Sequence, residues 1–202
     1  MPGPITHLKA AHYYNVKHGN KFGGLLYLGS ICPDSVNING HAPKEIRWPA
    51  HLRHSDLDKW TQNAERFYNE NKETIDEAYL KGYILHILTD IVWDMSFDWP
   101  LYTVMLKSGI EPENLKAERW NELYGFEQTD SGNKWFSEDV LPLLADAKAD
   151  DIGTLKKETV TLWQKKVVSK QLESGNNPRF VDEKLINDLI SEVFSLAERI
   201  FD

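Results

Sequence analysis

Apolar and aromatic side chains recur every three or four residues in the middle of the chain, and this spacing constrains the fold more than any other feature. The recurring positions are Tyr79, Tyr83, Trp93 and Phe97, and His86 and Asp90 continue the same spacing between them. Residues at this spacing share one face of an α-helix. We therefore predict a helix that opens at Thr74 and Glu77, a pair that resembles a capping box, and that ends or kinks at Pro100.

Helical signals also dominate the rest of the chain, and no segment shows the two-residue alternation of a half-buried strand. The predicted helices cover residues 4–18, 22–31, a segment opening at 55–58, 101–107, 112–124, 134–148, 154–172 and 182–201. Residues 32–54 show no periodicity and predict a long irregular loop, a kind of segment that is more often functional than filler. With 202 residues, 41% hydrophobic and 27% charged, the sequence predicts one all-α domain, a multi-helix bundle over residues 1–202.

The charge balance argues against a protein that coats nucleic acid. There are 23 Lys and Arg residues against 31 Asp and Glu, a net charge of −8, whereas a phosphate backbone attracts cationic surfaces. One run of basic residues alternates with Glu and apolar positions, which indicates a solvated helix face and no strong nucleic-acid patch. It comprises Lys156, Lys157, Lys165, Lys166 and Lys170.

The single cysteine, Cys32, excludes an intrachain disulfide framework and a CxxC metal or redox motif. The first residues, MPGPITHLKAAHYYN, contain no apolar signal-peptide core. No stretch approaches the roughly 18 apolar residues of a transmembrane helix. The expected location is the cytoplasm.

All seven histidines lie within the first 86 residues: His7, His12, His18, His41, His51, His54 and His86. The sharpest pattern among them is His86-Ile87-Leu88-Thr89-Asp90, because an i, i+4 spacing places imidazole and carboxylate together on the apolar face. An unpaired buried carboxylate there would cost several kcal/mol. A divalent metal that binds both groups removes this cost, and a metal-free, hydrogen-bonded His–Asp pair is the alternative.

Three weaker signals accompany this pair. Asp34 follows Pro33 at the start of the predicted loop, where it could equally cap a turn. His51 and His54 lie three residues apart near the end of the loop, and either alone could be a surface histidine. His7 lies in the first turn of the first predicted helix, where packing in the core is the simpler interpretation.

Taken in chain order, these signals resemble the zinc-dependent phospholipase C family. The matching motifs are THxxxA, LGSICPD, a histidine before a helix, and GYILHILTDIVWD. The likeness is to short leaderless bacterial members, and more distantly to the S1/P1-type nucleases, which share the helical zinc scaffold. It covers roughly residues 4–98, and residues 99–202 match only in helix content. The resemblance implies a phospholipase C/P1 nuclease-like bundle with metal-site motifs in its first half.

The resemblance also implies a ligand set. One ion would be held by Asp34, His51, His86 and Asp90, with His54 as an alternative to His51. Asp90 would bridge to a second ion held by His7. Asp94 and Asp98, one and two turns beyond Asp90, are candidates for the remaining ligands of the second ion.

The chain departs from the family in two respects. Met1-Pro2-Gly3 offers no amino-terminal tryptophan to ligate a metal, and no histidine remains after residue 86 for a third zinc. At most a dinuclear centre is implied, with two zinc ions expected and iron, manganese or nickel as alternatives.

The expected function is therefore hydrolysis of a small phosphoric ester, either a phosphodiester or a phosphomonoester. Asp34 and Asp90 would be the catalytic carboxylates, with Asp34 as proton acceptor for the attacking water. Aromatic side chains at Tyr83, Trp93 and Trp48 could wall the cleft, although core packing is the simpler interpretation of the first two. The alternative function is a non-catalytic helical metal-binding or interaction module with a partly decayed site.

Overall fold

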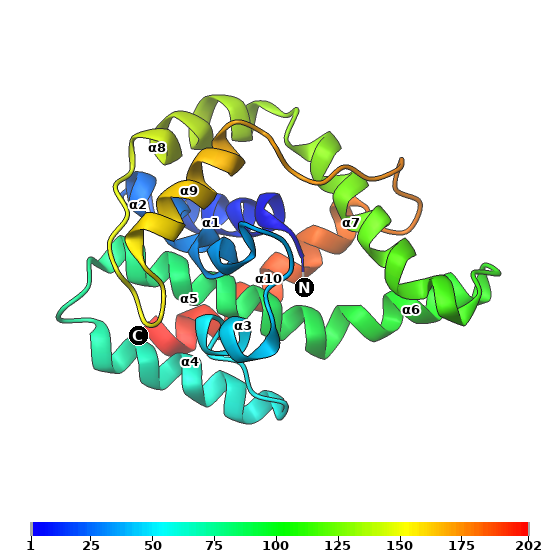
Figure 1. The fold of residues 1–202 in the computed structure, drawn as a ribbon, viewed down its shortest axis with the longest axis horizontal. Helices are drawn as coiled ribbons and strands as arrows, with labels where there is room; N and C mark the ends of the chain where they lie inside the picture. Colours follow the sequence, from blue (N-terminus) through cyan, green and yellow to red (C-terminus); the bar gives the residue numbers. More distant parts are fainter. Residues whose placement is uncertain (1, 202) are drawn as a thin grey trace.

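The computed structural model describes residues 2–201, and its regular elements in this range are helices (Figure 1). The α-helices are α1 (Pro4–Lys17), α2 (Gly23–Ile31), α3 (Lys44–Ala50), α4 (Leu57–Asn71), α5 (Glu77–Val92), α6 (Asp98–Lys107), α7 (Leu115–Asp130), α8 (Leu141–Asp146), α9 (Lys157–Val168) and α10 (Glu183–Phe201). Short 3-10 segments η1 (Cys32–Asn37) and η3 (Pro112–Asn114), and π-helical segments η2 (Trp93–Phe97) and η4 (Trp135–Val140), join or extend them. Within the described range the sole extended pairing is the isolated bridge Ile152–Leu155. The all-α prediction is confirmed.

Helix α5 lies in the core, and every residue from Ala78 to Val92 is buried. The predicted apolar stripe is therefore part of a helix that is covered on all sides. Its N-cap is Asp76, whose carboxylate accepts hydrogen bonds from the backbone N–H groups of Ala78 and Tyr79, so Thr74 is not the capping residue. Pro100 does not end the helix, because η2 and α6 continue from α5 and Pro100 falls in the first turn of α6.

The prediction of a long loop over residues 32–54 is wrong in two places. Residues Cys32–Asn37 form η1, and residues Lys44–Ala50 form α3. Both elements are short, polar and contain a proline, so they carry no apolar periodicity that would distinguish them from a loop. The structure thus provides rigid helical positions for Asp34 and His51, where the sequence predicted irregular chain.

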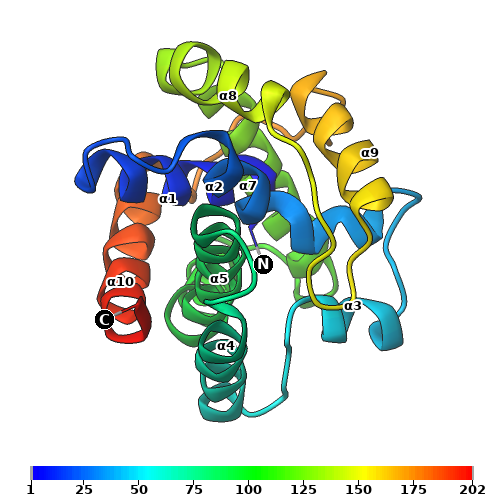
Figure 2. The same cartoon turned by 90° about the vertical axis from the view of Figure 1, so that its left-hand side faces the viewer.

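The contact between α2 and α5 brings the backbones of the two helices together. A Cβ built on Gly29 would lie 2.2 Å from the carbonyl oxygen of Tyr79, and one built on Gly82 would lie 2.1 Å from that of Leu26. Only glycine permits so close an approach. Figure 2 shows α1 and α2 lying across α5, and this crossing sets the positions of the segments that follow α2.

The start of α1 is held by a glutamate from α7. Gly3, the N-cap of α1, has no side chain to accept a hydrogen bond, and Glu127 Oε1 accepts from the backbone N–H of Thr6 at 3.0 Å and from its hydroxyl at 2.6 Å. Burial raises the pKa of Glu127 to about 7, against the opposing effect of these hydrogen bonds. Glu127 thus caps α1 from a distant element.

None of the helices in residues 2–201 has the length and apolar character needed to cross a lipid bilayer.

We expect Gly82→Ala to destabilise the protein, because the added methyl group would overlap the Leu26 carbonyl of α2. The gain in helix propensity, about 1 kcal/mol, is smaller than the cost of separating the backbones, and the free energy of unfolding should fall by about 2 kcal/mol. Urea unfolding measures the change. Gly132→Ala, at an exposed turn, is the control and should stay within about 0.5 kcal/mol of wild type. A Gly82→Ala protein as stable as wild type would contradict this packing.

Glu127 should make stability depend on pH. Its pKa is about 7 in the folded chain against 4.5 for the free side chain, so the folded state keeps a proton that the unfolded state has lost. The free energy of unfolding should therefore fall as pH rises from about 4.5 to 7, by about 3 kcal/mol in total. In Glu127→Gln this part of the pH dependence should disappear. Between pH 5 and pH 8 the free energy of unfolding should therefore fall less in the variant than in the wild-type protein. Urea unfolding at both pH values tests this, and the exposed Glu65→Gln should leave the pH dependence unchanged.

Candidate metal centre

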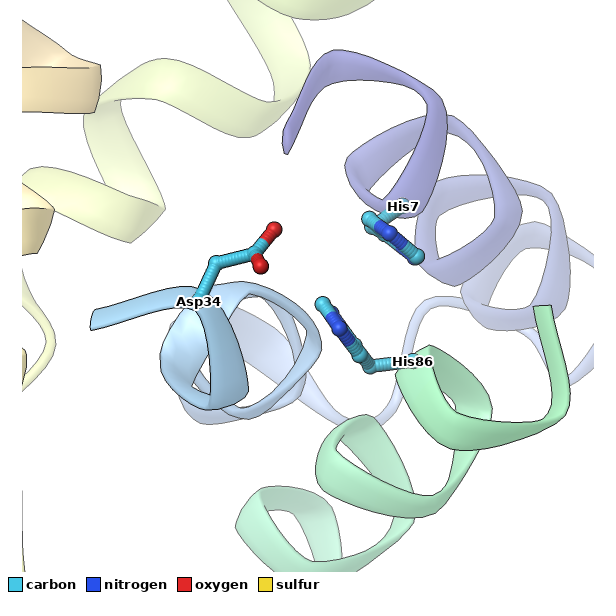
Figure 3. A group of neighbouring side chains, drawn as sticks. All are labelled: His7, Asp34 and His86. Atoms are coloured by element: carbon cyan, nitrogen blue, oxygen red, sulfur yellow. The ribbon is translucent and has the colours of Figure 1, made fainter. Parts of the chain in front are cut away.

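Four elements bring the five predicted ligands together in the interior. His7 comes from the first turns of α1, Asp34 from η1, His51 from the C-cap of α3, and His86 and Asp90 from α5. Figure 3 shows His7, Asp34 and His86 pointing toward one another from three elements. All five side chains are buried, and Asp34 retains the largest exposure, 8%.

Asp90 lies at the centre of the cluster with its two oxygens directed to different histidines. Its Oδ1 lies 3.6 Å from His7 Nε2, and its Oδ2 lies 3.7 Å from His86 Nε2 and 3.9 Å from His51 Nε2. Asp34 Oδ1 lies 3.3 Å from His51 Nε2. Two donor atoms that share a tetrahedral zinc ion are about 3.3 Å apart, since each bond is about 2.0–2.1 Å long. The separations are close to those of ligands around a common ion.

The donor atoms form two overlapping groups within 4.8 Å. One contains His7, Asp34 and His86, and the other contains His51, His86 and Asp90. The two groups share His86, so the five residues make one continuous cluster. This arrangement brings together the residues predicted as a ligand set.

Backbone carbonyls orient two of the imidazole rings. His86 Nδ1 lies 2.8 Å from the carbonyl oxygen of Ser30, and His51 Nδ1 lies 2.9 Å from that of Arg47. A carbonyl oxygen only accepts hydrogen bonds, so Nδ1 carries the proton in both rings. In His86 this leaves Nε2 of the neutral ring as an acceptor directed at Asp90, the orientation typical of metal-binding histidines, whereas Nε2 of His51 donates to Asp34 Oδ1. The rings of His7 and His86 stack in parallel, with centroids 3.7 Å apart.

Several of these buried atoms have no hydrogen-bond partner among the described residues: Nε2 of His7, Nε2 of His86, and both carboxylate oxygens of Asp90. Each such atom costs about 1–3 kcal/mol when it is left unsatisfied. Divalent cations bound among these atoms would satisfy all of them. The residues present therefore fit a metal site.

Burial dominates the protonation of the three groups deepest in the cluster. It raises the pKa of Asp90 to about 7 and lowers the pKa values of His7 and His86 well below 6.5. The charge of His51 further lowers the pKa of His7, and the nearby His7 further lowers that of His86. Both histidines are consequently neutral at pH 7, the form that ligates a metal.

His51 and Asp34 behave as a pair. Burial acts to lower the pKa of His51, but the hydrogen bond to Asp34 and the charges of Asp34 and Asp90 outweigh it and raise that pKa. Burial acts to raise the pKa of Asp34, but the hydrogen bond to His51 and the charges of His86 and His51 outweigh it, so that pKa is lowered. Asp34 is therefore ionised at the edge of the cluster.

The less certain ligands lie in other contacts. His54 Nδ1 accepts a hydrogen bond from the backbone N–H of Asp56 at 2.9 Å, at the start of α4. Asp94 pairs with the guanidinium of Arg53, and Asp98 Oδ1 lies 2.7 Å from Nη1 of Arg119. The structure does not bring these three residues into the group of potential ligands formed by the other five.

A cavity of about 960 Å³ adjoins the cluster, and Asp34 lies in its wall. Trp48 also lines this cavity, as proposed from the sequence. Tyr83 and Trp93 are fully buried in the core, so the simpler interpretation of these two aromatic residues is correct. Lys166 lines the cavity and packs over the ring of Trp163, so it does not belong to a purely solvated face.

Sequence reasoning missed most of the charged lining of the cavity. Lys44 and Arg47 lie three residues apart, which places them on one face of α3, but the prediction of a loop concealed this signal. Lys116 and Arg119 show the same spacing on α7, some seventy residues later. No local pattern in the sequence indicates that the two pairs line one cavity.

Comparison of the chain with protein-family models, with curated proteins and with solved structures finds no match.

The cluster predicts that metal binding depends on His7 and not on His12, the second buried histidine of α1. His12 contacts Tyr27 and Trp135 outside the cluster. We expect the wild-type protein, purified without chelator, to contain about two divalent ions per chain by elemental analysis. His7→Ala should lose at least one of them, because it removes a donor that faces Asp90. His12→Ala is the matched control and should keep the wild-type content. Equal metal content in both variants would exclude His7 as a ligand.

Proposed function

We propose that this chain is a metal-dependent hydrolase that cleaves phosphoric esters, either phosphodiesters or phosphomonoesters, at a dinuclear zinc-type centre. His7, Asp34, His51, His86 and Asp90 would hold the ions. The observation that carries the proposal is Asp90, which is fully buried, has no hydrogen-bond partner among the described residues, and is surrounded by three histidine nitrogens. Such a carboxylate is stable as an anion only when a cation binds it.

The position of Asp34 favours catalysis over a purely structural role. A structural zinc site is closed by four protein ligands, whereas a catalytic site leaves a position for water or substrate. Here Asp34 belongs both to the cluster and to the wall of the 960 Å³ cavity. A ligand in the cavity would therefore meet the centre on its Asp34 side.

The residues have separate tasks in this scheme. Bound divalent ions lower the pKa of water and polarise phosphoryl oxygens, which is the chemistry the metal supplies. Asp34, ionised at the cavity wall, accepts the proton of the attacking water. Ser30 and Arg47 fix the rings of His86 and His51 through their carbonyl oxygens, so that Nε2 faces the carboxylates. Lys and Arg side chains in the cavity wall offset the charge of the ester.

A specific observation favours the second candidate, a non-catalytic metal-binding module with a partly decayed site. Asp94 and Asp98 were the candidates for the remaining ligands of the second ion. Each is paired with an arginine, Asp94 with Arg53 and Asp98 with Arg119. A guanidinium neutralises a carboxylate that would otherwise bind metal. In this candidate function the first ion stabilises the bundle and the second is absent.

Hydrolysis assays on the zinc-loaded chain separate the two functions. We expect release of p-nitrophenolate from p-nitrophenyl phosphate or bis(p-nitrophenyl) phosphate, and loss of this activity after removal of zinc. In Asp34→Asn we expect kcat to fall at least about 100-fold, because the variant cannot accept a proton. Asp58→Asn, at an exposed position of α4, is the control and should keep the wild-type kcat. A zinc-loaded wild-type chain that cleaves neither ester would favour the non-catalytic module.

A further inference from the structure

Six Lys and Arg side chains line the cavity beside the candidate metal centre, against five Asp and Glu side chains, whereas the chain as a whole has a net charge of −8. Its lining includes Arg53 and Arg119, which are paired with Asp94 and Asp98. Four further cations line it and take part in no ion pair within residues 2–201: Lys44, Arg47, Lys116 and Lys166. The positive charge of these four side chains is therefore available to a ligand in the cavity.

Two of these cations line the cavity together with His41 and come from elements far apart in the sequence. The guanidinium of Arg47, on α3, contacts the ring of His41, which precedes α3. Lys116, in the first turns of α7, lines the same cavity. Burial and then the charges of Arg47 and Lys116 lower the pKa of His41. Positive side chains from two separate elements therefore line the same cavity as His41, which favours an anion there.

Arg47 also connects this group to the candidate metal centre. Its carbonyl oxygen is 2.9 Å from Nδ1 of His51, while its guanidinium reaches His41. One residue of a seven-residue helix thus contacts both groups. A molecule with two anionic groups could reach the metal centre and the cationic group together.

We propose that His41, Arg47 and Lys116 bind a second phosphate group of the substrate, beyond the ester placed at the metal centre. This inference rests on the proposed function and defines its substrate class as a small organic molecule with two phosphate groups. A phosphate presents several oxygens to donors that approach from different directions, and the planar guanidinium of Arg47 can bind two of them. The exposed ammonium of Lys116, on α7, supplies a further donor in the same cavity.

Non-hydrolysable ligands test the proposal on the full-length, zinc-loaded chain by calorimetry. The probes are alkane bisphosphonates of increasing chain length, each paired with the alkylphosphonate of the same length. We expect at least one bisphosphonate to bind about tenfold or more tightly than its partner, because the second group gains charged hydrogen bonds within one molecule. In the double variant Arg47→Gln/Lys116→Gln this preference should fall to about twofold or less.

The control is Arg66→Gln/Lys165→Gln, which removes the same charges from exposed helical positions outside the cavity and should retain the preference. If Arg47→Gln impairs folding, the bisphosphonate preference is measured in the single variant Lys116→Gln, whose substitution lies at an exposed position. A preference that is absent in wild type, or that survives in the double variant, would overturn the proposal. The affinity of the alkylphosphonate tests the metal centre separately. If that affinity does not depend on zinc while the bisphosphonate preference persists, the proposed function fails, and only the binding of a phosphate group by His41, Arg47 and Lys116 is supported.

Discussion

The close crossing of α2 and α5 is the constraint on which the site depends. Because neither Gly29 nor Gly82 has a Cβ, the two backbones meet at a distance that no other residue permits. The crossing places the carbonyl oxygen of Ser30, the residue after Gly29, within 2.8 Å of His86 on α5. Asp34 follows in η1, directly after α2, and so faces the same side of α5. The geometry of the candidate ligands is thus a consequence of helix packing, and a side chain at either glycine would displace the site together with the core.

This packing places ionisable side chains in the interior, where burial opposes their charged forms. Burial raises the pKa of Asp90 to about 7, which means that the interior opposes its ionisation. His7 and His86 are held neutral beside it with their Nε2 atoms unsatisfied. A cluster of this kind is destabilising without a cation and stabilising with one, so metal binding at the proposed site would be coupled to folding. Hydrophobic packing on every other side of α5 provides the stability that permits such an arrangement.

The sequence predicted the parts of this structure that local patterns encode. The three-and-four spacing identified α5, and the i, i+4 pair identified His86 and Asp90 as neighbours on it. The all-helical fold followed from the absence of alternation. Elements without a periodic apolar face, η1 and α3, could not be distinguished from a loop. The apolar stripe predicted helix through Trp93 and Phe97, but the π-helical form of η2 and the continuation of the helix past Pro100 have no sequence signal. Long-range pairs such as Arg53–Asp94 and Arg119–Asp98 depend on tertiary packing, so the sequence named Asp94 and Asp98 as candidate ligands without indicating that an arginine pairs with each.

These two arginine pairs bear on how the proposed centre would hold its ions. One ion would have Asp34, His51, His86 and Asp90 available, whereas His7 and the second oxygen of Asp90 are the described groups left for the other. Affinity for a metal grows with the number of protein ligands, so the first ion would be bound tightly and the second weakly. A weakly held ion needs further oxygen ligands, and the phosphoryl group of a substrate can supply them at the side of the cluster where Asp34 meets the cavity. The same pairing that deprives the centre of Asp94 and Asp98 keeps the cavity wall from becoming acidic, which would repel a phosphate ester. The two arginine pairs would therefore favour an anionic substrate in the proposed function, because the carboxylates that they neutralise no longer repel it.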